Sequence, residues 1–316
     1  MTIKRIRLFK AYLILIGAAP MLSTDLYLPA LPAISDYYDT QDSITNMTMI
    51  LFMATQAICS LLWGPISDRI GRRPVVITGG ALYFAGSLLC MFSGNIELLV
   101  VSRVIQAAGG GAAVMAASAY VKDVFPEERR EQVLSLVQGM SLFGPAVAPS
   151  IGALILRVSD WRGIFVLMVA MGAVMLLGAI VFPETLREPS GQSALRAFGR
   201  LWFVMKNRRF ASVVLIFGIP AIGTMAFINA SPYIFESHFG LSEQIYGIFF
   251  AASAVAMMAG AFAYAPLTAR LSRTPVAVIS LGVSAVSGIC ILLVGDVSPF
   301  VFIACILPTS FTCAMC

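Results

Sequence analysis

The chain of 316 residues is 59% hydrophobic and only 12% charged, with a mean hydropathy of +0.89. Soluble domains have about 45–50% apolar and about 25% charged residues, so this composition excludes a soluble globular domain. The net charge of +5 does not indicate nucleic-acid binding, because the basic residues lie in short stretches between long apolar runs. The composition therefore indicates an integral membrane protein.

Ten apolar runs are each long enough to cross a hydrocarbon core of about 30 Å as a helix. They lack the alternation of a membrane barrel, and lipid leaves helices as the other way to satisfy backbone groups. The sequence predicts an all-α integral membrane protein whose transmembrane helices lie near residues 8–33, 44–66, 74–93, 96–120, 132–155, 161–182, 210–231, 244–266, 275–295 and 298–315.

The basic residues predict the orientation of these helices in the membrane. Arg103 lies inside a span, and Arg157 and Arg162 lie between spans 5 and 6. Every other Lys and Arg falls in the amino terminus or in a loop that joins an even span to the next odd one. By the positive-inside rule, the amino terminus and those loops face the cytoplasm.

The connection between spans 6 and 7 is the longest, and it divides the chain into three parts. We expect a bundle of six helices over residues 1–183, a cytoplasmic linker over 184–209 and a second bundle with four spans over 210–316. From Ser190 to Arg209, apolar residues recur at helical spacing beside basic ones. The pattern is typical of an amphipathic helix on the inner membrane surface, but a basic linker that only fixes topology fits equally well.

Two residues of opposite charge, Asp25 and Arg103, lie inside predicted spans. Each costs about 2.5–3.5 kcal/mol at the centre of a bilayer. The helical rise puts both roughly 8–12 Å below the outer surface. A static ion pair is one interpretation, but a buried pair rarely stabilises a protein more than apolar residues do. We therefore favour a functional role for both.

The loop between spans 2 and 3 carries a spaced pattern, G-x-x-x-D-R-x-G-R-R. It is formed by Gly64, Asp68, Arg69, Gly71, Arg72 and Arg73. Gly64 permits close approach of another helix, Gly71 permits a tight turn, and Asp68 can cap a helix start while it pairs with an arginine. The pattern resembles the loop 2/3 motif of the major facilitator superfamily, which implies a cytoplasmic gate latch. The alternative is a loop that its basic residues merely anchor in the cytoplasm.

Three further stretches narrow the resemblance. Ser23–Pro32, Arg103–Ala113 and Gly144–Gly152 are similar to signatures of the drug:proton antiporters, especially the bicyclomycin and chloramphenicol resistance branch. The antiporter motif of span 5 is carried by Gly144, Pro145, Pro149 and Gly152, with Ala148-Pro149 in place of the usual Gly-Gly. The glycine run within span 4 lacks the G-K-[ST] of a phosphate loop, so we interpret it as close helix packing.

The resemblance implies a major facilitator fold of twelve helices in two pseudo-symmetric halves, and we expect a C-terminally truncated member with ten. It also implies export of small amphipathic drugs, such as phenicols or bicyclomycin, in exchange for protons, with Asp25 and Arg103 in the coupling. We expect no enzymatic activity, cofactor or metal. Candidates for the substrate cavity are Tyr27, Gln106, Asn229 and Tyr233.

The expected setting is the bacterial inner membrane, with a monomer in the lipid bilayer that handles protons and a small-molecule substrate and binds no nucleic acid. Two alternatives remain open. The first alternative to drug export is an exporter of a single metabolite on the same fold, since fold does not fix substrate. The second is an inactive truncated transporter fragment.

Overall fold

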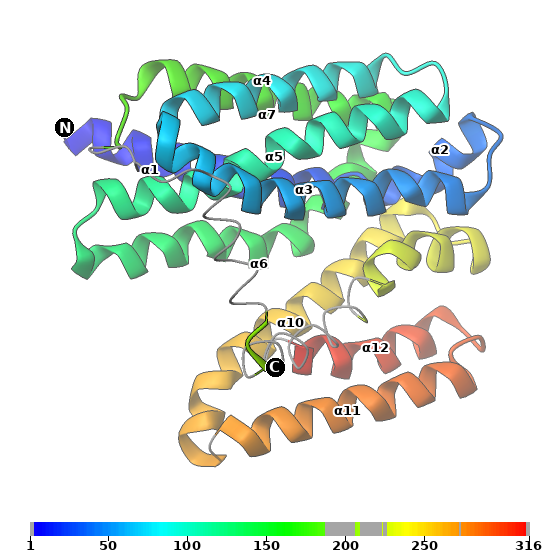
Figure 1. The fold of residues 1–316 in the computed structure, drawn as a ribbon. Coiled ribbons are helices and arrows are strands. Elements are labelled where there is room, and N and C mark those ends of the chain that lie inside the picture. The colour runs from blue at the N-terminus through cyan, green and yellow to red at the C-terminus, as the bar shows by residue number, and fades with distance from the viewer. Residues whose placement is uncertain (1–2, 187–205, 209–222, 224–225, 272, 314–316) are drawn as a thin grey trace.

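The computed structural model describes residues 3–186, 206–208, 223, 226–271 and 273–313, and its regular structure in these ranges is helical throughout (Figure 1). This confirms the predicted all-α class. The elements are α1 (Ile3–Asp25), η1 (Leu28–Ala30), α2 (Leu31–Tyr37), α3 (Asp42–Ile70), α4 (Arg72–Met91), α5 (Ile96–Val124), α6 (Glu127–Val158), α7 (Arg162–Val181), η2 (Tyr233–His238), α10 (Glu243–Leu271), α11 (Arg273–Val294) and α12 (Pro299–Cys313).

Nine of the ten predicted spans coincide with helices in the described ranges, and the remaining one, 210–231, lies mostly outside them. By length and composition, six described segments can cross a membrane: Ile6–Tyr37, Asp42–Ile70, Arg72–Met91, Ile96–Val124, Arg162–Val181 and Glu243–Thr268. Shorter apolar stretches lie in α6, α11 and α12. The predicted amphipathic helix of the linker falls almost entirely outside the described residues.

The first span differs from the prediction because its helix is interrupted. The α-helix ends at Asp25, and the chain continues through a turn and the short 3-10 helix η1 into α2. Pro29 and Pro32 follow the break, and neither can donate a backbone N–H to a helical ladder. The proline pair therefore places Asp25 at the end of a helix rather than in the middle of one.

Glycines let the helices of the first half pack closely. A Cβ at Gly111 would lie 2.8 Å from the Ser60 nitrogen on α3, and one at Gly109 would overlap the Gly79 carbonyl on α4. Both neighbouring helices therefore approach the backbone of α5 directly, which confirms the interpretation of the glycine run as a packing feature.

The two halves meet along α6 and α10, and α11 and α12 lie on the far side of α10 from the first half (Figure 1). The halves also meet at the end of the bundle opposite the amino terminus, where η2 contacts α2. There the Tyr233 hydroxyl donates to the Asp42 carbonyl at 3.2 Å. Contact between the halves thus extends to the end of the bundle that holds α2.

An aromatic cluster surrounds one arginine at this same end. The Arg162 guanidinium lies 4.3 Å from the centre of the Trp161 ring and 4.6 Å from that of Tyr37. It also donates to the Tyr37 hydroxyl at 3.1 Å, and the Tyr38 ring packs 5.7 Å from Trp161. These contacts join the start of α7 to α2 mainly through ring faces and apolar surface.

Candidate functional site

Asp25 is the last residue of α1 and is only 1% exposed. Its Oδ2 atom has no hydrogen-bond partner among the described residues. A Cβ built on Gly144 of α6 would lie 3.5 Å from that oxygen, so the carboxylate faces the backbone of the antiporter stretch. The structure therefore brings together two sequence signatures, from span 1 and span 5, at one buried acid.

Arg103 is completely buried in α5 and is held by aromatic rings and an amide. Its guanidinium carbon lies 4.5 Å from the centre of the Tyr27 ring and 4.0 Å from that of Phe52. Nη1 donates to Gln106 Oε1 at 2.7 Å, and Nη2 donates to the Ser23 carbonyl at 3.5 Å. Cation–π contacts and neutral acceptors therefore replace a counter-ion around this charge.

Asp25 and Arg103 form no ion pair, although both belong to the described part of the chain. The static ion pair considered from the sequence is therefore not present in this structure. A buried charge without a partner is costly, and for an acid this cost falls when a proton neutralises it. A change in the protonation of Asp25 would therefore not require any described salt bridge to break.

The four residues proposed for a substrate cavity do not converge. Tyr27 and Gln106 are fully buried around Arg103, where Tyr27 contacts the Thr48 hydroxyl at 3.0 Å and Gln106 Nε2 donates to Ser87 at 2.8 Å. Both hold the arginine in place. Asn229 and Tyr233 lie in the second half and face α3 of the first half.

Asn229 and Tyr233 border the junction between the halves. Asn229 Nδ2 lies 3.9 Å from the Met53 sulfur on α3. Tyr233 helps to line a cavity of about 390 Å³, together with Asp42, Ser43, Asn46, Ala230, Ile234 and His238. Both residues therefore contact the first half of the chain, and these contacts would change if the two halves moved relative to each other.

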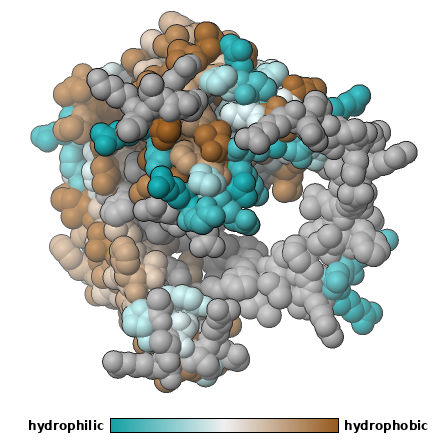
Figure 2. All heavy atoms as spheres, turned by 90° about the vertical axis from the view of Figure 1, so that its left-hand side faces the viewer, coloured by the Kyte–Doolittle hydropathy of each residue, from teal (hydrophilic) through white to brown (hydrophobic). Residues whose placement is uncertain are grey.

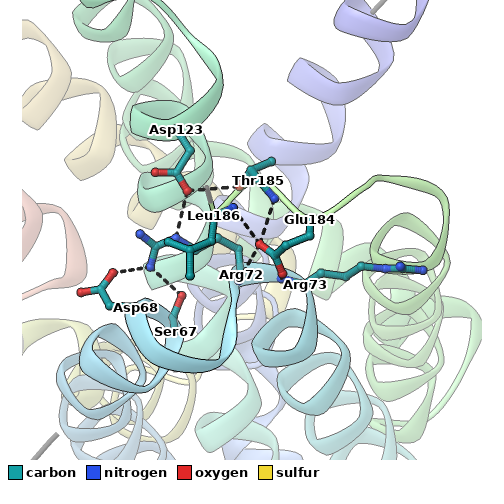
Figure 3. Close-up of polar contacts among 8 residues, drawn as sticks. All are labelled: Ser67, Asp68, Arg72, Arg73, Asp123, Glu184, Thr185 and Leu186. Carbon is teal, nitrogen blue, oxygen red and sulfur yellow. Dashed lines mark hydrogen bonds and ion pairs between the residues drawn. The ribbon is translucent and has the colours of Figure 1, made fainter. Parts of the chain in front are cut away.

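A second polar cluster lies at the other end of the bundle, around the loop between α3 and α4 (Figure 3). Arg72 contacts Asp68 as an ion pair, donates from Nη1 to Ser67 at 2.8 Å and from Nε to Asp123 of α5 at 2.9 Å. The predicted pairing of Asp68 with a neighbouring arginine is confirmed. Arg72 thus joins the ends of three helices.

Glu184, which the sequence interpretation missed, caps the start of α4. Its Oε1 accepts from the Arg72 N–H and its Oε2 from the Arg73 N–H, both at 2.9 Å (Figure 3). The Thr185 and Leu186 N–H groups donate to Oε1 as well, at 2.8 and 2.9 Å. Partial burial raises the pKa of Glu184, but these backbone N–H groups outweigh it, so the pKa lies below its usual value.

The helix cap expected from Asp68 is therefore wrong, because Asp68 lies near the end of α3 and Glu184 occupies the capping position. Gly71 joins the two helices with φ +107°, which confirms the predicted tight turn. Arg73 extends the contact to α7 by donating to the carbonyls of Ala179 and Ile180. The loop is thus bound to both α5 and α7.

Two other members of the motif make fewer contacts. Around Gly64, no heavy atom of the described chain lies within 4 Å of a built Cβ, so the predicted close approach of another helix is not seen here. Arg69 is exposed beside Asp68, whose side chain is 52% exposed despite its bond to Arg72. Figure 2 shows hydrophilic side chains gathered on this face of the molecule. Among the described residues, Asp68 and Arg69 are therefore the exposed members of this motif's acid–arginine sequence.

The antiporter motif lies entirely within α6, which stays helical through Pro145 and Pro149. A Cβ at Gly152 would overlap the Leu26 carbonyl, in the turn that follows Asp25. The glycines of this motif thus let α6 pack closely against the chain at the point where the helix of the first span is interrupted.

Comparisons with known proteins all point to one family. Residues 13–316 match the sequence profile described as Major Facilitator Superfamily. The chain is 30% identical over 239 residues to "Multidrug resistance protein MdtL" of Klebsiella pneumoniae (strain 342), and 30% identical over 249 residues to "Uncharacterized MFS-type transporter YdgK" of Bacillus subtilis (strain 168). These alignments cover 75% and 76% of this chain and 61% of each relative, so the chain matches about three fifths of their length.

Among solved structures, the chain superposes with a TM-score of 0.73 on a bacterial homologue of the human lysosomal transporter Spinster, described as inward-facing and occupied. The superposition covers 100% of this chain and 74% of the other, at 17% sequence identity. At this identity the likeness concerns the fold.

Proposed function

The chain belongs to the major facilitator superfamily, and we propose that it takes part in proton-coupled efflux of small amphipathic drugs by alternating access. Membership of a transporter family agrees with a multi-pass membrane protein rather than an enzyme. The relative named as a multidrug resistance protein supports drugs as the substrate class. The proposed substrates include phenicols and bicyclomycin, as the resemblance to that antiporter branch implies.

The observation that carries this proposal is the buried acid at the end of α1. Asp25 is enclosed, lacks a counter-ion among the described residues, and faces the glycine of the antiporter stretch. An ionisable residue inside a membrane protein is costly and points to a transport role. Because α6 also packs against α10 of the second half, a shift of α6 would change the surroundings of Asp25.

The proposed cycle exchanges a proton, carried by Asp25, for a drug molecule. When the site faces outward, a proton binds to Asp25 and the drug leaves; when it faces inward, drug binding releases the proton to the cytoplasm. Each pH unit across the membrane supplies about 1.4 kcal/mol per proton, and each 100 mV about 2.3 kcal/mol. Arg103 tunes the proton affinity of Asp25 when conformational change alters their separation.

The proposed orientation places the amino terminus and the α3–α4 loop in the cytoplasm of a bacterium, with the protein in the inner membrane. The distribution of basic residues supports it. In this orientation the Arg72 cluster lies at the cytoplasmic end, and α2 and η2 lie at the outer end.

Growth of drug-sensitive cells that express the gene tests the proposal. We expect protection against phenicols, bicyclomycin or cationic dyes in the parent and none with Asp25→Asn, while membrane insertion is unchanged because a neutral amide is cheaper to bury. Arg103→Ala should lose more protection than Arg103→Lys, which keeps the charge but not the planar fork. Absence of protection by an inserted parent protein would reject drugs as the substrate.

A further inference from the structure

A cavity of about 500 Å³ lies at the end of the bundle that holds the Arg72 cluster, on the face that Figure 2 shows. It is formed where α5 ends and α6 begins, beside the segment that follows α7. Its lining residues are Lys122, Asp123, Val124, Phe125, Pro126, Arg130 and Thr185. Neither the proposed coupling of Asp25 nor the contacts of the α3–α4 loop explain the two basic residues in this lining.

The one acid in the lining, Asp123, already has partners. Its Oδ2 accepts from Arg72 Nε at 2.9 Å and from the Thr185 hydroxyl at 3.1 Å (Figure 3). The Arg72 cluster contains as many acids as arginines, namely Asp68, Asp123 and Glu184 beside Arg69, Arg72 and Arg73. Asp123 therefore belongs to a group that is neutral as a whole, and it does not cancel the charges of Lys122 and Arg130.

Arg130 of α6 is fixed by one edge of its guanidinium. Its Nε donates to the carbonyl of Phe125 at 3.0 Å, and Phe125 is itself buried. Its Nη1 and Nη2 atoms have no hydrogen-bond partner among the described residues. The planar group is thus held in place and keeps donors for an anion.

Two lysines lie close to the same phenylalanine. Lys122 of α5 lines the cavity with an exposed side chain, and Nζ of Lys10 of α1 lies 5.3 Å from the centre of the Phe125 ring. No described ion pair involves Lys10, Lys122 or Arg130. Cations from three helices therefore gather around Phe125 without an anionic partner in the described part of the chain.

The topology rule alone does not explain this arrangement. It requires basic residues on one side of the membrane, at any position in the loops. It does not require cations from three helices around one residue, nor an arginine bound to a backbone carbonyl. The acids that follow in sequence, Glu127 and Glu128, are exposed and do not belong to the lining. The arrangement fits recognition of an anion from outside the chain.

We propose that this cavity binds a phosphate group, with Arg130 and Lys122 as its ligands and Lys10 as a nearby positive charge. A phosphate group offers several acceptor oxygens and negative charge, which suit an arginine fork and a lysine ammonium. The cavity has room beside such a group, and Val124, Phe125 and Pro126 add apolar surface, so the phosphate is one that carries an organic substituent. An anionic lipid of the adjacent leaflet and a soluble phosphate ester share this chemistry.

Thermal unfolding of the purified protein in detergent tests the proposal, because it needs neither a drug nor a proton gradient. One arm adds phosphatidylglycerol to the micelles, with phosphatidylcholine as the comparison. The other adds glycerol phosphate, with sodium chloride at equal ionic strength. We expect the unfolding temperature to rise to a plateau with one of the two phosphates. In Arg130→Gln the midpoint concentration should be about tenfold higher or more, because a hydrogen bond to a charged group is lost.

Lys122→Gln separates binding from folding, because Lys122 makes no described side-chain hydrogen bond. It should raise the midpoint as well, while its unfolding temperature without added phosphate stays at the parent value. Arg129→Gln is the matched control, because Arg129 is an exposed neighbour outside the lining and its loss changes the net charge equally. Its midpoint should equal that of the parent.

A plateau with phosphatidylglycerol alone assigns the phosphate to a lipid, and a plateau with glycerol phosphate shows that a soluble ester suffices. If neither arm reaches a plateau, the proposal is overturned. An equal change in Arg129→Gln and Arg130→Gln also overturns it, because binding then depends on surface charge in general. Each of these outcomes leaves the proposed role of Asp25 unaffected.

Discussion

The Glu184 carboxylate occupies the space that a side chain at Gly71 would need, although the two residues lie in different loops. A Cβ on Gly71 would overlap Glu184 Oε2, and the φ of +107° at Gly71 already disfavours any other residue. The capping interaction and the tight turn therefore depend on each other.

We expect Gly71→Ala to lower the free energy of unfolding by about 1–3 kcal/mol for the backbone conformation alone, with a further loss as Glu184 is displaced. Thermal unfolding in detergent measures the change. Gly64→Ala is the control, because it lies in a helix with no described neighbour within 4 Å. The double variant Gly71→Ala with Glu184→Ala should lose less than the two single losses combined, and simple additivity would contradict the proposed contact.

Glu184 should make stability depend on pH in the acidic range. Since its pKa is lowered in the folded protein, its stabilising effect is complete above the unfolded pKa of about 4.3 and is lost as pH falls through the lower folded value. We expect the unfolding temperature of Glu184→Gln to lie below that of the parent at neutral pH and to approach it below about pH 4. A difference that stays constant between pH 7 and pH 3 would show that charge is not the cause.

The two glycines of the antiporter stretch should respond differently to the same substitution. Gly144→Ala adds a methyl group at ordinary contact distance from Asp25, so stability should change little. Gly152→Ala would overlap the Leu26 carbonyl, a backbone atom that cannot move aside alone, and should cost about 1–3 kcal/mol. Unfolding temperatures of the pair in one detergent decide the question, and equal losses would contradict the packing described here.

Gln106→Leu should destabilise the first half by about 1.5–3 kcal/mol, because it removes the neutral acceptor 2.7 Å from the Arg103 guanidinium. Gln106→Glu keeps an acceptor at the same place and should recover most of that loss. Yield of folded protein and unfolding temperature report both effects. Equal behaviour of the two variants would mean that the hydrogen bond to Arg103 contributes little.

Much of the fold follows from hydropathy, because a membrane-spanning helix needs a long apolar run whatever its neighbours are. Local chemistry also predicts Gly71 correctly, since a tight turn between two helices selects glycine by its own backbone. The interruption after Asp25 was not predicted, although Pro29 and Pro32 are local signals for it. The length of the apolar run predicts one continuous helix, and that expectation took no account of the two prolines.

The contacts of the site were harder to predict, because they join residues far apart in the chain. Glu184 caps a helix that begins more than a hundred residues earlier, and no spacing rule connects the two. Equal depth suggested that Asp25 and Arg103 meet, but depth does not fix the direction in which a side chain points around its helix. Arg103 turns to the Phe52 ring on α3 and to Tyr27, whereas Asp25 turns to α6.

The two ends of the first half are held by different forces, and dissolved ions act on them unequally. Arg72 and Glu184 rely on charges, some of them exposed, which counter-ions screen within about 10 Å at 0.1 M salt. Arg162 also forms an exposed ion pair with Asp160, but its contacts to α2 are the face of the Tyr37 ring and a hydrogen bond to the Tyr37 hydroxyl, which screening weakens less. A rise in ionic strength therefore weakens the contacts at the Arg72 end of this bundle more than those at the Arg162 end. The salt concentration of the cytosol and that of the external medium should then affect the conformational equilibrium differently.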